Sequence, residues 1–443
     1  MPEHSLECTS FQSDSPGSGI MAHFLAGTDN NATPDSSHAM FVRRRVVEKK
    51  GASLRIAIVQ HGDYAAAYET YSTDRPEPYA GMKTSVAALE MLVADRQFLL
   101  VSLDAPSYRT AHRNGTLLGA PLRKMPAFMP RRIADAIRRA QIRRELNRFE
   151  PTHLLIRTSG QLATDLLSYG AKHSVSALVV FANVFDPDNR SKWPTANVIR
   201  LLNQAFVYRV GNHLQPAVDS MIECGLSPLK AAAYDFDVTR GIQQYEPKQL
   251  SVGEICRLVF AGNLITVKGC EDVILAAAEL STRGIPTELT VFGDGPDREK
   301  LQNLAESLPE GLVTLMGRQP NEDVVHAMRM ATFVCVPSHR RFPEGMPLAL
   351  TEALSTRAPV IASAHPVFVR AFRDGEGVRF VPEKQPLQIA RVIEQVWNSP
   401  KEYAQLSRST TLALDRIRCK IVFADLLREW EASFMPISDT AAI

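Results

Sequence analysis

Short apolar runs alternate with helical stretches along most of this chain, from Leu54 to Val381. The runs are rich in Val, Ile, Leu and Phe and do not alternate apolar with polar residues. Such runs are typical of parallel strands that are covered on both faces. Parallel neighbours also need long crossover connections, which the intervening helical stretches can supply. The pattern therefore predicts an α/β fold with doubly wound parallel sheets.

A polar stretch, 234–252, interrupts the alternation once and divides it into two series. The first series contains predicted strands at 54–60, 98–102, 153–157, 177–182 and 205–210, with a helix at 84–93. The second contains predicted strands at 257–261, 287–292, 312–315, 333–336, 360–362 and 378–381, with a helix at 271–282. We expect two Rossmann-like domains, over 53–245 and 246–419, because both have an ordinary domain size. Ligands bind at the carboxyl ends of strands in such sheets, so we expect a site in a cleft between the domains.

Residues 1–52 differ from the rest of the chain. They are rich in Ser, Asp, Asn, Thr and Gly, show no apolar period and end in a basic run. A signal peptide has basic residues first and an apolar core next, and neither condition is met here. We expect a disordered tail, with Met21 and Met40 as alternative starts.

Composition excludes several classes of protein. The 443 residues carry 50 Lys plus Arg against 48 Asp plus Glu, a net charge of +2, so we expect no nucleic-acid partner. Apolar runs fall short of the roughly 18 residues that a membrane-spanning helix needs. The six cysteines, at positions 8, 224, 256, 270, 335 and 419, are far apart and include no Cys-x-x-Cys. They are typical of reduced thiols in a cytoplasmic protein and predict neither disulfides nor a zinc site.

The segment 336–363 carries the main functional signal. Its sequence, VPSHRRFPEGMPLALTEALSTRAPVIAS, leads from a predicted strand through a loop into a helix that begins near Met346 or Pro347. Proline favours a first helical position, and the free N–H groups of a helix start form an anion site. Glu344 and Glu352 flank this start, and a carboxylate can accept hydrogen bonds from both hydroxyls of a diol. The segment therefore predicts a sugar-nucleotide site.

This segment resembles the donor site of the family-4 retaining glycosyltransferases, which have the GT-B fold of two Rossmann-like domains facing a cleft. Their signature is Glu-x7-Glu in a context of Glu-Gly, Leu, Glu-Ala and Pro-Val-Ile, and Glu344 and Glu352 have this spacing. The resemblance implies that Glu344 contacts the donor sugar and Glu352 the ribose hydroxyls. It also implies that the intervening residues line the donor site: Gly345, Met346, Pro347 and Leu348. The alternative makes Glu344 a loop charge and Glu352 a solvated helix residue.

The stretch 260–269 is similar to the family's Gly-Arg-Leu…Lys-Gly loop, whose Arg and Lys hold the diphosphate. Lys268 matches, whereas Asn263 stands where the family usually has Arg. An amide can donate to a phosphate oxygen but carries no charge. We hypothesise that Arg340 or Arg341 supplies the missing charge, since both lie on the loop leading to Glu344.

Three glycines extend the resemblance. Gly293 and Gly295 match the family's Gly-x-Gly-Pro turn near the nucleotide, although an ordinary strand-to-helix turn explains them equally well. Gly317 follows the next predicted strand, where the family packs the base against the backbone. These residues complete the predicted donor site.

The first domain matches the family less closely. Gly81 alone remains of a glycine-rich loop near the diphosphate, and Asn183 stands where a His commonly lies close to the donor sugar. His61, at the end of the first predicted strand, is an alternative to Asn183, or simply a polar residue at a strand terminus. Asp186 and Asp188 form an Asp-x-Asp pair, which we assign to a turn rather than to a metal site.

The region 123–148 contains nine basic residues and two acidic ones. On a helical wheel, Ile133, Ala136, Ile137 and Ala140 share one face, opposite several arginines. Such a helix could lie on an anionic bilayer, and it could equally be the solvated face of a crossover helix.

The resemblance implies a hexosyltransferase-type enzyme that retains the anomeric configuration. Its first domain would bind a saccharide or lipid-linked acceptor from polysaccharide biosynthesis, with helix 420–434 packed back on it, and its second would bind the nucleotide-sugar donor. Glu344, Lys268 and Asn183 are the candidate catalytic residues. We expect no metal and no cofactor besides the donor, and a cytoplasmic location, either free or peripheral at the inner face of the membrane. Two alternatives remain open: a non-catalytic sugar-nucleotide-binding or scaffold protein, and a nucleotide-sugar epimerase.

Overall fold

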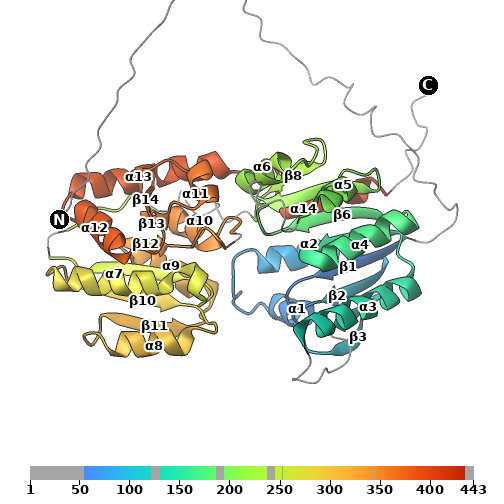
Figure 1. Ribbon diagram of the computed structural model, residues 1–443, viewed down its shortest axis with the longest axis horizontal. Coiled ribbons are helices and arrows are strands. Elements are labelled where there is room, and N and C mark those ends of the chain that lie inside the picture. The colour runs from blue at the N-terminus through green and yellow to red at the C-terminus, as the bar shows by residue number, and fades with distance from the viewer. Residues whose placement is uncertain are drawn as a thin grey trace, which may run out of the picture. The chain divides into compact units, whose positions relative to one another are not determined.

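The computed structural model describes residues 54–120, 130–185, 194–236, 245–251, 253–342 and 344–434. This part of the chain contains two α/β units, each with helices around a sheet, which we call the first and second lobes (Figure 1). The first sheet has the strand order β3-β4-β2-β1-β5-β6-β7-β8 and the second the order β11-β10-β9-β12-β13-β14. Apart from the antiparallel pair β3–β4, every pairing between these strands is parallel. The predicted fold class is confirmed, whereas the tail 1–52 lies outside the described residues.

The first sheet contains five strands that the sequence predicted and three that it did not. Its strands are β1 (Arg55–Gln60), β2 (Gln97–Ser102), β3 (Tyr108–His112), β4 (Gly115–Gly119), β5 (His153–Arg157), β6 (Ser176–Phe181), β7 (Val207–His213) and β8 (Ala231–Tyr234). The expectation that the strand near 205–210 closes the series is wrong, because β8 pairs with β7 at the edge of the sheet. Strands β3 and β8 escaped prediction because the first is polar and exposed and the second is mostly alanine.

Helices cover both faces of the first sheet. They are α1 (Tyr64–Ser72), α2 (Met82–Val93), α3 (Arg131–Phe149), α4 (Gly160–His173), α5 (Ala196–Leu202), α6 (Gln215–Glu223) and α14 (Phe423–Ala432). One apolar core lies under α3 to α6, and a second lies under α1, α2 and α14. The helix α14 comes from the end of the described chain, and its Trp430 is fully buried in the second of these cores.

The second lobe repeats the arrangement around a smaller sheet. Its strands are β9 (Cys256–Ala261), β10 (Thr287–Phe292), β11 (Val313–Gly317), β12 (Phe333–Val336), β13 (Val360–Ser363) and β14 (Val378–Val381). A 3-10 turn (Thr266–Lys268) follows β9, and the helices are α7 (Cys270–Thr282), α8 (Arg298–Glu306), α9 (Asn321–Met330), α10 (Leu348–Ser355), α11 (Pro366–Ala371), α12 (Pro386–Trp397) and α13 (Pro400–Ile417). Apolar cores again lie on both faces of the sheet.

Both sheets have a topological switch point, where the connections from two neighbouring strands run in opposite directions. In the first sheet β1 has β2 on one side and β5 on the other, and in the second β9 has β10 on one side and β12 on the other. Loops that leave the carboxyl ends of strands at such a point diverge and open a crevice for a ligand. The two switch points are therefore the first places to look for functional residues.

Two further findings concern membranes and disulfides. None of the described helices combines the length and apolar character required to cross a bilayer. The cysteines at 224, 256, 270, 335 and 419 are all free thiols.

Candidate functional site

An ion pair occupies the switch point of the second sheet. Lys268 ends the turn after β9, Glu344 lies in the loop after β12, and Lys268 Nζ donates to Glu344 Oε2. The same oxygen accepts a hydrogen bond of 2.8 Å from Ser338 Oγ. Lys268 Nζ also lies 4.6 Å from the centre of the Phe342 ring, within the range of a cation–π contact. A cation and a carboxylate predicted from distant parts of the chain thus come together at the carboxyl edge of the sheet.

Backbone and side-chain bonds hold the two loops against each other. His339 N donates to Val267 O at 2.8 Å, which ties the loop after β12 to the turn after β9. His339 Nε2 lies 3.0 Å from Asp272 Oδ2 on α7. His365, after β13, makes a 3.0 Å hydrogen bond from its ring to Phe342 O and so braces the segment that leads to Glu344. Burial lowers the pKa of His365, while this bond raises it. The position of Glu344 is therefore fixed from three sides.

The helix α10 begins beside this ion pair. It starts at Leu348, and Pro347 precedes it with an extended backbone (ψ 130°). The prediction that Pro347 or Met346 is the first helical residue is therefore wrong by one or two positions. No side chain caps the helix start, and Met346 is buried in the adjacent core. The first backbone N–H groups of α10 remain available to an anion.

Glu352 lies inside α10 and is only 6% exposed, as is Glu344. Asn321 Nδ2, at the start of α9, donates to Glu352 Oε1 at 2.7 Å. Burial raises the pKa of Glu352, and the nearby Glu77 raises it further, while the bond from Asn321 lowers it. The alternative interpretation of Glu352 as a solvated helix residue is wrong, because its side chain is buried. Glu344 does lie in a loop, but it is buried as well.

The predicted glycines Gly293, Gly295 and Gly317 lie where two strands of the second sheet, β10 and β11, end. Gly293 has φ 125°, and a Cβ atom there would lie 1.9 Å from Gly262 O, so the loops after β9 and β10 touch through their backbones. Gly295 lies against the backbone of Leu264, and the guanidinium of Arg298 lies over Gly317. A side chain at Gly293 would separate the two loops.

The candidates for a second contact to the diphosphate, Asn263, Arg340 and Arg341, are all exposed. Asn263 follows Gly262 at the edge of the sheet, and its carbonyl accepts a bond from Ile265 N. Arg340 and Arg341 lie on the loop before Glu344, and Arg340 N donates to Glu383 Oε2 at 2.5 Å. Arg340 and Arg341 thus lie close to Glu344 in sequence, whereas Asn263 lies in the loop after β9.

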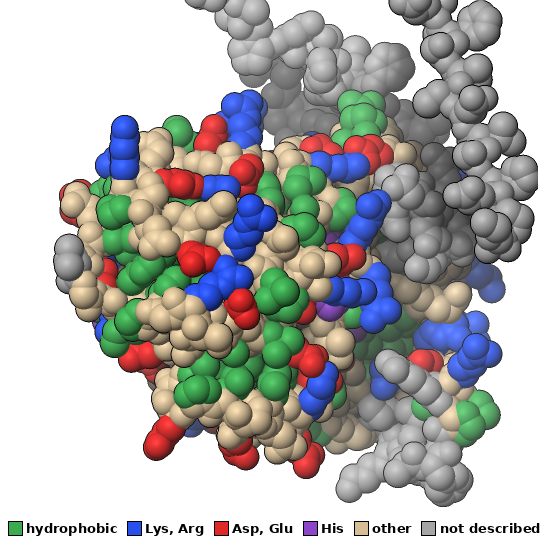
Figure 2. All heavy atoms as spheres, turned by 60° about the vertical axis from the view of Figure 1, so that its left-hand side comes forward, with side chains coloured by type: hydrophobic (Ala, Val, Ile, Leu, Met, Phe, Trp, Pro, Cys, Tyr) green, Lys and Arg blue, Asp and Glu red, His purple; other side chains and the backbone are tan. Residues whose placement is uncertain are grey.

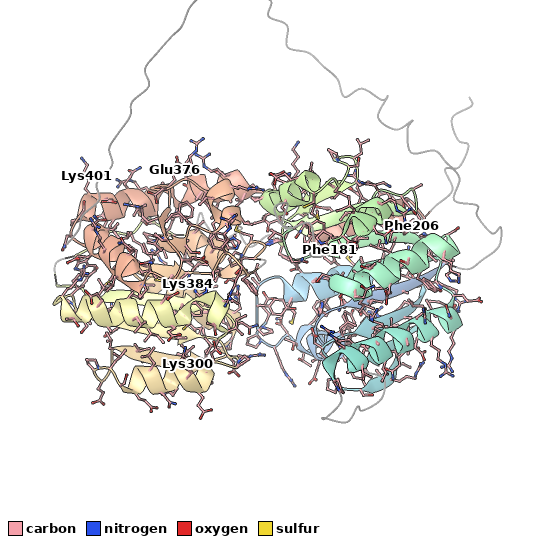
Figure 3. The ribbon with its side chains drawn as sticks, in the orientation of Figure 1. Phe181, Phe206, Lys300, Glu376, Lys384 and Lys401 are labelled. Atoms are coloured by element: carbon pink, nitrogen blue, oxygen red, sulfur yellow. The ribbon has the colours of Figure 1, made fainter. Side chains whose placement is uncertain are left out.

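A loop of the first lobe reaches the same region. Figure 3 labels Phe181, the last residue of β6, and Ala182 and Asn183 follow it. A Cβ atom at Gly345 would lie 2.7 Å from Ala182 O, so the backbones next to Asn183 and Glu344 touch. Asn183 itself is half-buried, and its carbonyl accepts a 3.0 Å bond from Asn212 Nδ2. Asn183 is thus brought close to the predicted donor residues through its backbone.

Gly81 lies at the start of α2 and is packed against the ring of Phe236. The loop before it reaches α9, since Asn321 N donates to Glu77 O at 2.9 Å. Glu77 therefore connects the counterpart of the family's glycine-rich loop to the residue that holds Glu352. Asp186 and Asp188 lie outside the described residues, and the described part of the chain contains no cluster of His, Cys, Asp and Glu suited to a metal.

Of a group of polar side chains at the switch point of the first sheet, the sequence analysis identified only His61. His61 Nδ1 lies 3.0 Å from Asp104 Oδ2 and its Nε2 lies 3.1 Å from Thr158 Oγ1. Next to them, Arg157 Nη1 donates to Gln60 Oε1 at 2.9 Å. The signal that could have identified this group is that these residues end or follow β1, β2 and β5.

Part of the chain is similar in sequence to known proteins. Residues 243–412 match the family described as glycosyl transferases group 1. The alpha-D-kanosaminyltransferase of Streptomyces kanamyceticus is 28% identical over 146 residues, 32% of this chain and 37% of that protein. The D-inositol 3-phosphate glycosyltransferase of Frankia alni is 30% identical over 161 residues, 34% of this chain and 39% of that protein. The chain thus matches less than half the length of these curated relatives.

Solved structures share the fold over most of the chain. The sucrose-phosphate synthase of Thermosynechococcus elongatus has a TM-score of 0.60 at 14% identity, covering 86% of this chain and 98% of that one. The HepE protein of Anabaena, solved in complex with UDP-glucose, has a TM-score of 0.56 at 13% identity, with coverage of 86% and 99%. WaaG, a glycosyltransferase involved in lipopolysaccharide biosynthesis, has a TM-score of 0.55 at 12% identity, with coverage of 85% and 98%. The chain therefore has a GT-B type fold, and its residues 243–412 match the glycosyl transferases group 1 family.

Proposed function

We propose that this chain is a family-4 retaining glycosyltransferase that moves a hexose-type unit from a nucleotide diphosphate sugar to an acceptor hydroxyl. The observation that carries the proposal is the contact between Lys268 and Glu344 beside the start of α10. Lys268 offers a cation to a diphosphate, α10 offers free N–H groups, and Glu344 offers a carboxylate to sugar hydroxyls. The group 1 match over 243–412 and the UDP-glucose bound to HepE, a protein of similar fold, support it.

The proposal gives each residue a task in the reaction. Negative charge grows on the leaving diphosphate, and Lys268 and the start of α10 stabilise it. Binding of the donor displaces Glu344 from Lys268, so that its carboxylate is free for the donor sugar, while Glu352 accepts bonds from the ribose. The configuration is retained by attack from the face that the diphosphate leaves, with the departing oxygen receiving the acceptor's proton. Asn183 would lie beside the donor sugar, a placement that the contact of Ala182 with Gly345 supports.

The proposal includes independence of a divalent metal, because Lys268 and the helix start supply the positive potential that a metal would otherwise provide. Turnover measured before and after exhaustive chelation tests this part alone. A loss of activity on chelation that added magnesium or manganese restores would contradict it.

Turnover of a panel of uridine, guanosine and adenosine diphosphate sugars, with an extract of cell lipids and saccharides as acceptors, tests the main proposal. We expect Glu344→Gln to lower turnover at least about a hundredfold, since it removes a contact to the reacting sugar. Glu310→Gln, at an exposed position of the same lobe, serves as the control. Nucleotide binding without turnover of any donor would favour the scaffold alternative, and a changed sugar released without acceptor would favour the epimerase.

We further propose that α3 contacts an anionic membrane at the cytoplasmic face, where a lipid-linked acceptor would be found. The helix carries seven arginines. Of these, Arg132, Arg143 and Arg144 are exposed and have no ion-pair partner among the described residues. A cavity of about 150 Å³ between α3 and α4 is lined by Arg139 and Arg143 together with apolar side chains such as Ile142 and Leu166. The face of the second lobe in Figure 2 instead shows basic and acidic side chains interspersed.

Sedimentation with vesicles of phosphatidylglycerol or of phosphatidylcholine tests the membrane contact. We expect more protein to sediment with the anionic vesicles, and the double variant Arg143→Gln/Arg144→Gln to reduce that fraction several-fold, because each basic residue near an anionic surface contributes about 1 kcal/mol. Arg408→Gln, on α13 of the second lobe, is the control. Equal sedimentation with both kinds of vesicle would rule out this contact.

A further inference from the structure

Arg157 is a half-buried arginine at the switch point of the first sheet. It is the last residue of β5, directly beside the end of β1. Its Nη1 donates to Gln60 Oε1 at 2.9 Å, and its guanidinium carbon lies 4.5 Å from the centre of the Phe423 ring at the start of α14. These two contacts fix the plane of the guanidinium. Arg157 is therefore held rigidly without having its charge neutralised.

None of the carboxylates in the described part of the chain lies within ion-pair distance of Arg157. Two other half-buried arginines of the same lobe do have such a partner, since Arg96 pairs with Glu431 and Arg139 pairs with Asp165. Arg209 on β7 has none among the described residues, but it donates to the Ala231 carbonyl. Buried charges in proteins are normally paired, because a charge taken out of water without a partner is costly. Arg157 therefore carries a cost in the free protein that a bound anion would remove.

The surroundings of Arg157 add hydrogen-bonding groups to the positive charge. Burial lowers the pKa of Arg157, and the electrostatic influence of Tyr234, Tyr79 and Tyr64 raises it. The side chain of Thr158, the next residue, bonds to His61, which in turn bonds to Asp104. A cation and a hydrogen-bonded hydroxyl, imidazole and carboxylate thus lie on neighbouring residues at the carboxyl edge of the sheet, as in a site for a phosphorylated, hydroxyl-bearing molecule.

We propose that Arg157 binds an anionic group of the acceptor, of the phosphate class, at the crevice between β1 and β5. The planar fork of an arginine matches two phosphate oxygens at once, and the bond from Gln60 and the ring of Phe423 prepare it for that contact. The assignment of the anion to the acceptor rests on the proposed transferase function, whereas the anion site itself rests on the contacts of Arg157.

The contacts of Arg157 favour the acceptor over the donor as the source of this anion. Gln60 and Phe423 belong to β1 and to α14, which both pack in the first lobe. The donor residues Lys268 and Glu344 lie at the switch point of the other sheet. Two separate crevices, each with a cation, fit a reaction between two substrates.

Titration of the full chain with inorganic phosphate at low ionic strength, with and without saturating UDP, tests the proposal. We expect saturable phosphate binding in both conditions, and an apparent affinity at least about tenfold lower in Arg157→Gln, because a charge-assisted bidentate contact is lost. Arg157→Lys keeps the charge but not the fork, so it should lose less. The matched control is Arg209→Gln, which removes a half-buried arginine on β7 that donates to Ala231 O on β8, and this variant should bind phosphate normally.

The outcomes separate this inference from the proposed function. Equal phosphate affinity in the wild-type protein and in folded Arg157→Gln, or failure of the wild-type protein to bind phosphate, would overturn it. Loss of phosphate binding when UDP is added would assign the anion to the donor and overturn the acceptor assignment. Unchanged UDP affinity in Arg157→Gln leaves the transferase proposal intact in every case. If Arg157→Gln does not fold, the phosphate affinity of Arg157→Lys is compared with that of Arg209→Gln. A lower affinity in Arg157→Lys supports the inference, and equal affinities overturn it.

Discussion

The two switch points hold similar residues in different electrostatic states. In the second sheet, Lys268 after β9 contacts the carboxylate of Glu344 after β12. In the first, Arg157 at the end of β5 contacts the neutral amide of Gln60 at the end of β1. The topology opens a crevice at both places, but among the described residues only the cation of the second crevice contacts a carboxylate. Equivalent positions in one fold can therefore hold an internally paired site and a site that still lacks an anion.

The largest expected effect comes from Lys268→Met. It removes the positive charge proposed to stabilise the leaving diphosphate, so we expect turnover to fall about 10²–10³-fold. Steady-state kinetics with the best donor from the panel would measure the loss. Lys300→Met is the control, since Lys300 pairs with Glu271 on the exposed side of the same lobe (Figure 3). Equal activities of the two variants would contradict the role of Lys268.

Next in size is the effect of Gly293→Ala on stability. A Cβ atom at this position would lie 1.9 Å from Gly262 O, so the loops after β9 and β10 must separate. We expect a loss of about 2–3 kcal/mol in the free energy of unfolding, measured by urea denaturation. Gly62→Ala is the matched control in the first lobe: Gly62 also has a positive φ, 84°, but a Cβ atom there would have nothing within 4 Å. Similar losses in both variants would show that backbone strain, and not the close approach of the loops, causes the loss of stability.

The apolar strands of both sheets were predictable, because a strand that is buried on both faces has an uninterrupted run of apolar residues in the sequence. Strand β5 was predicted with its observed bounds, while β3, whose residues are YRTAH, has no such mark since it lies exposed at the sheet edge. The start of α10 was predicted one or two residues early, because Pro347 is extended and precedes the helix.

The contacts within the two crevices could not be predicted from residue patterns. Lys268 and Glu344 are 76 residues apart, and Arg157 and Gln60 are 97 apart. What joins each pair is the order of the strands, since β9 lies beside β12 and β1 lies beside β5. The family resemblance identified Lys268 and Glu344 separately. Arg157 belongs to no motif, and its contact with Gln60 became evident only from the pairing of β5 with β1.

A variant that makes the first crevice resemble the second sharpens the comparison. Gln60→Glu would place a carboxylate next to Arg157, as Glu344 is placed next to Lys268. We expect the apparent affinity for inorganic phosphate to fall about tenfold, because an internal partner then competes for the guanidinium. Phosphate titration measures this, and Gln161→Glu on α4 controls for the added charge alone. Unchanged phosphate binding in Gln60→Glu would argue that the crevice does not depend on an unpaired cation.

The smallest effect concerns Glu352, where stability and binding should change in opposite directions. Burial raises the pKa of this carboxyl, so the folded state holds the proton more tightly than the unfolded state, and ionisation at neutral pH works against folding. Glu352→Gln removes that cost and can still accept the bond from Asn321. We therefore expect the variant to be more stable than the wild-type protein by about 1 kcal/mol at neutral pH, and the difference to vanish at a pH below the ordinary pKa of glutamate. Urea denaturation at the two pH values measures this change.

Donor affinity should fall in the same variant, because a neutral amide is a weaker acceptor for ribose hydroxyls than a carboxylate. A variant that is less stable at neutral pH would show that the carboxylate serves the fold rather than a ligand.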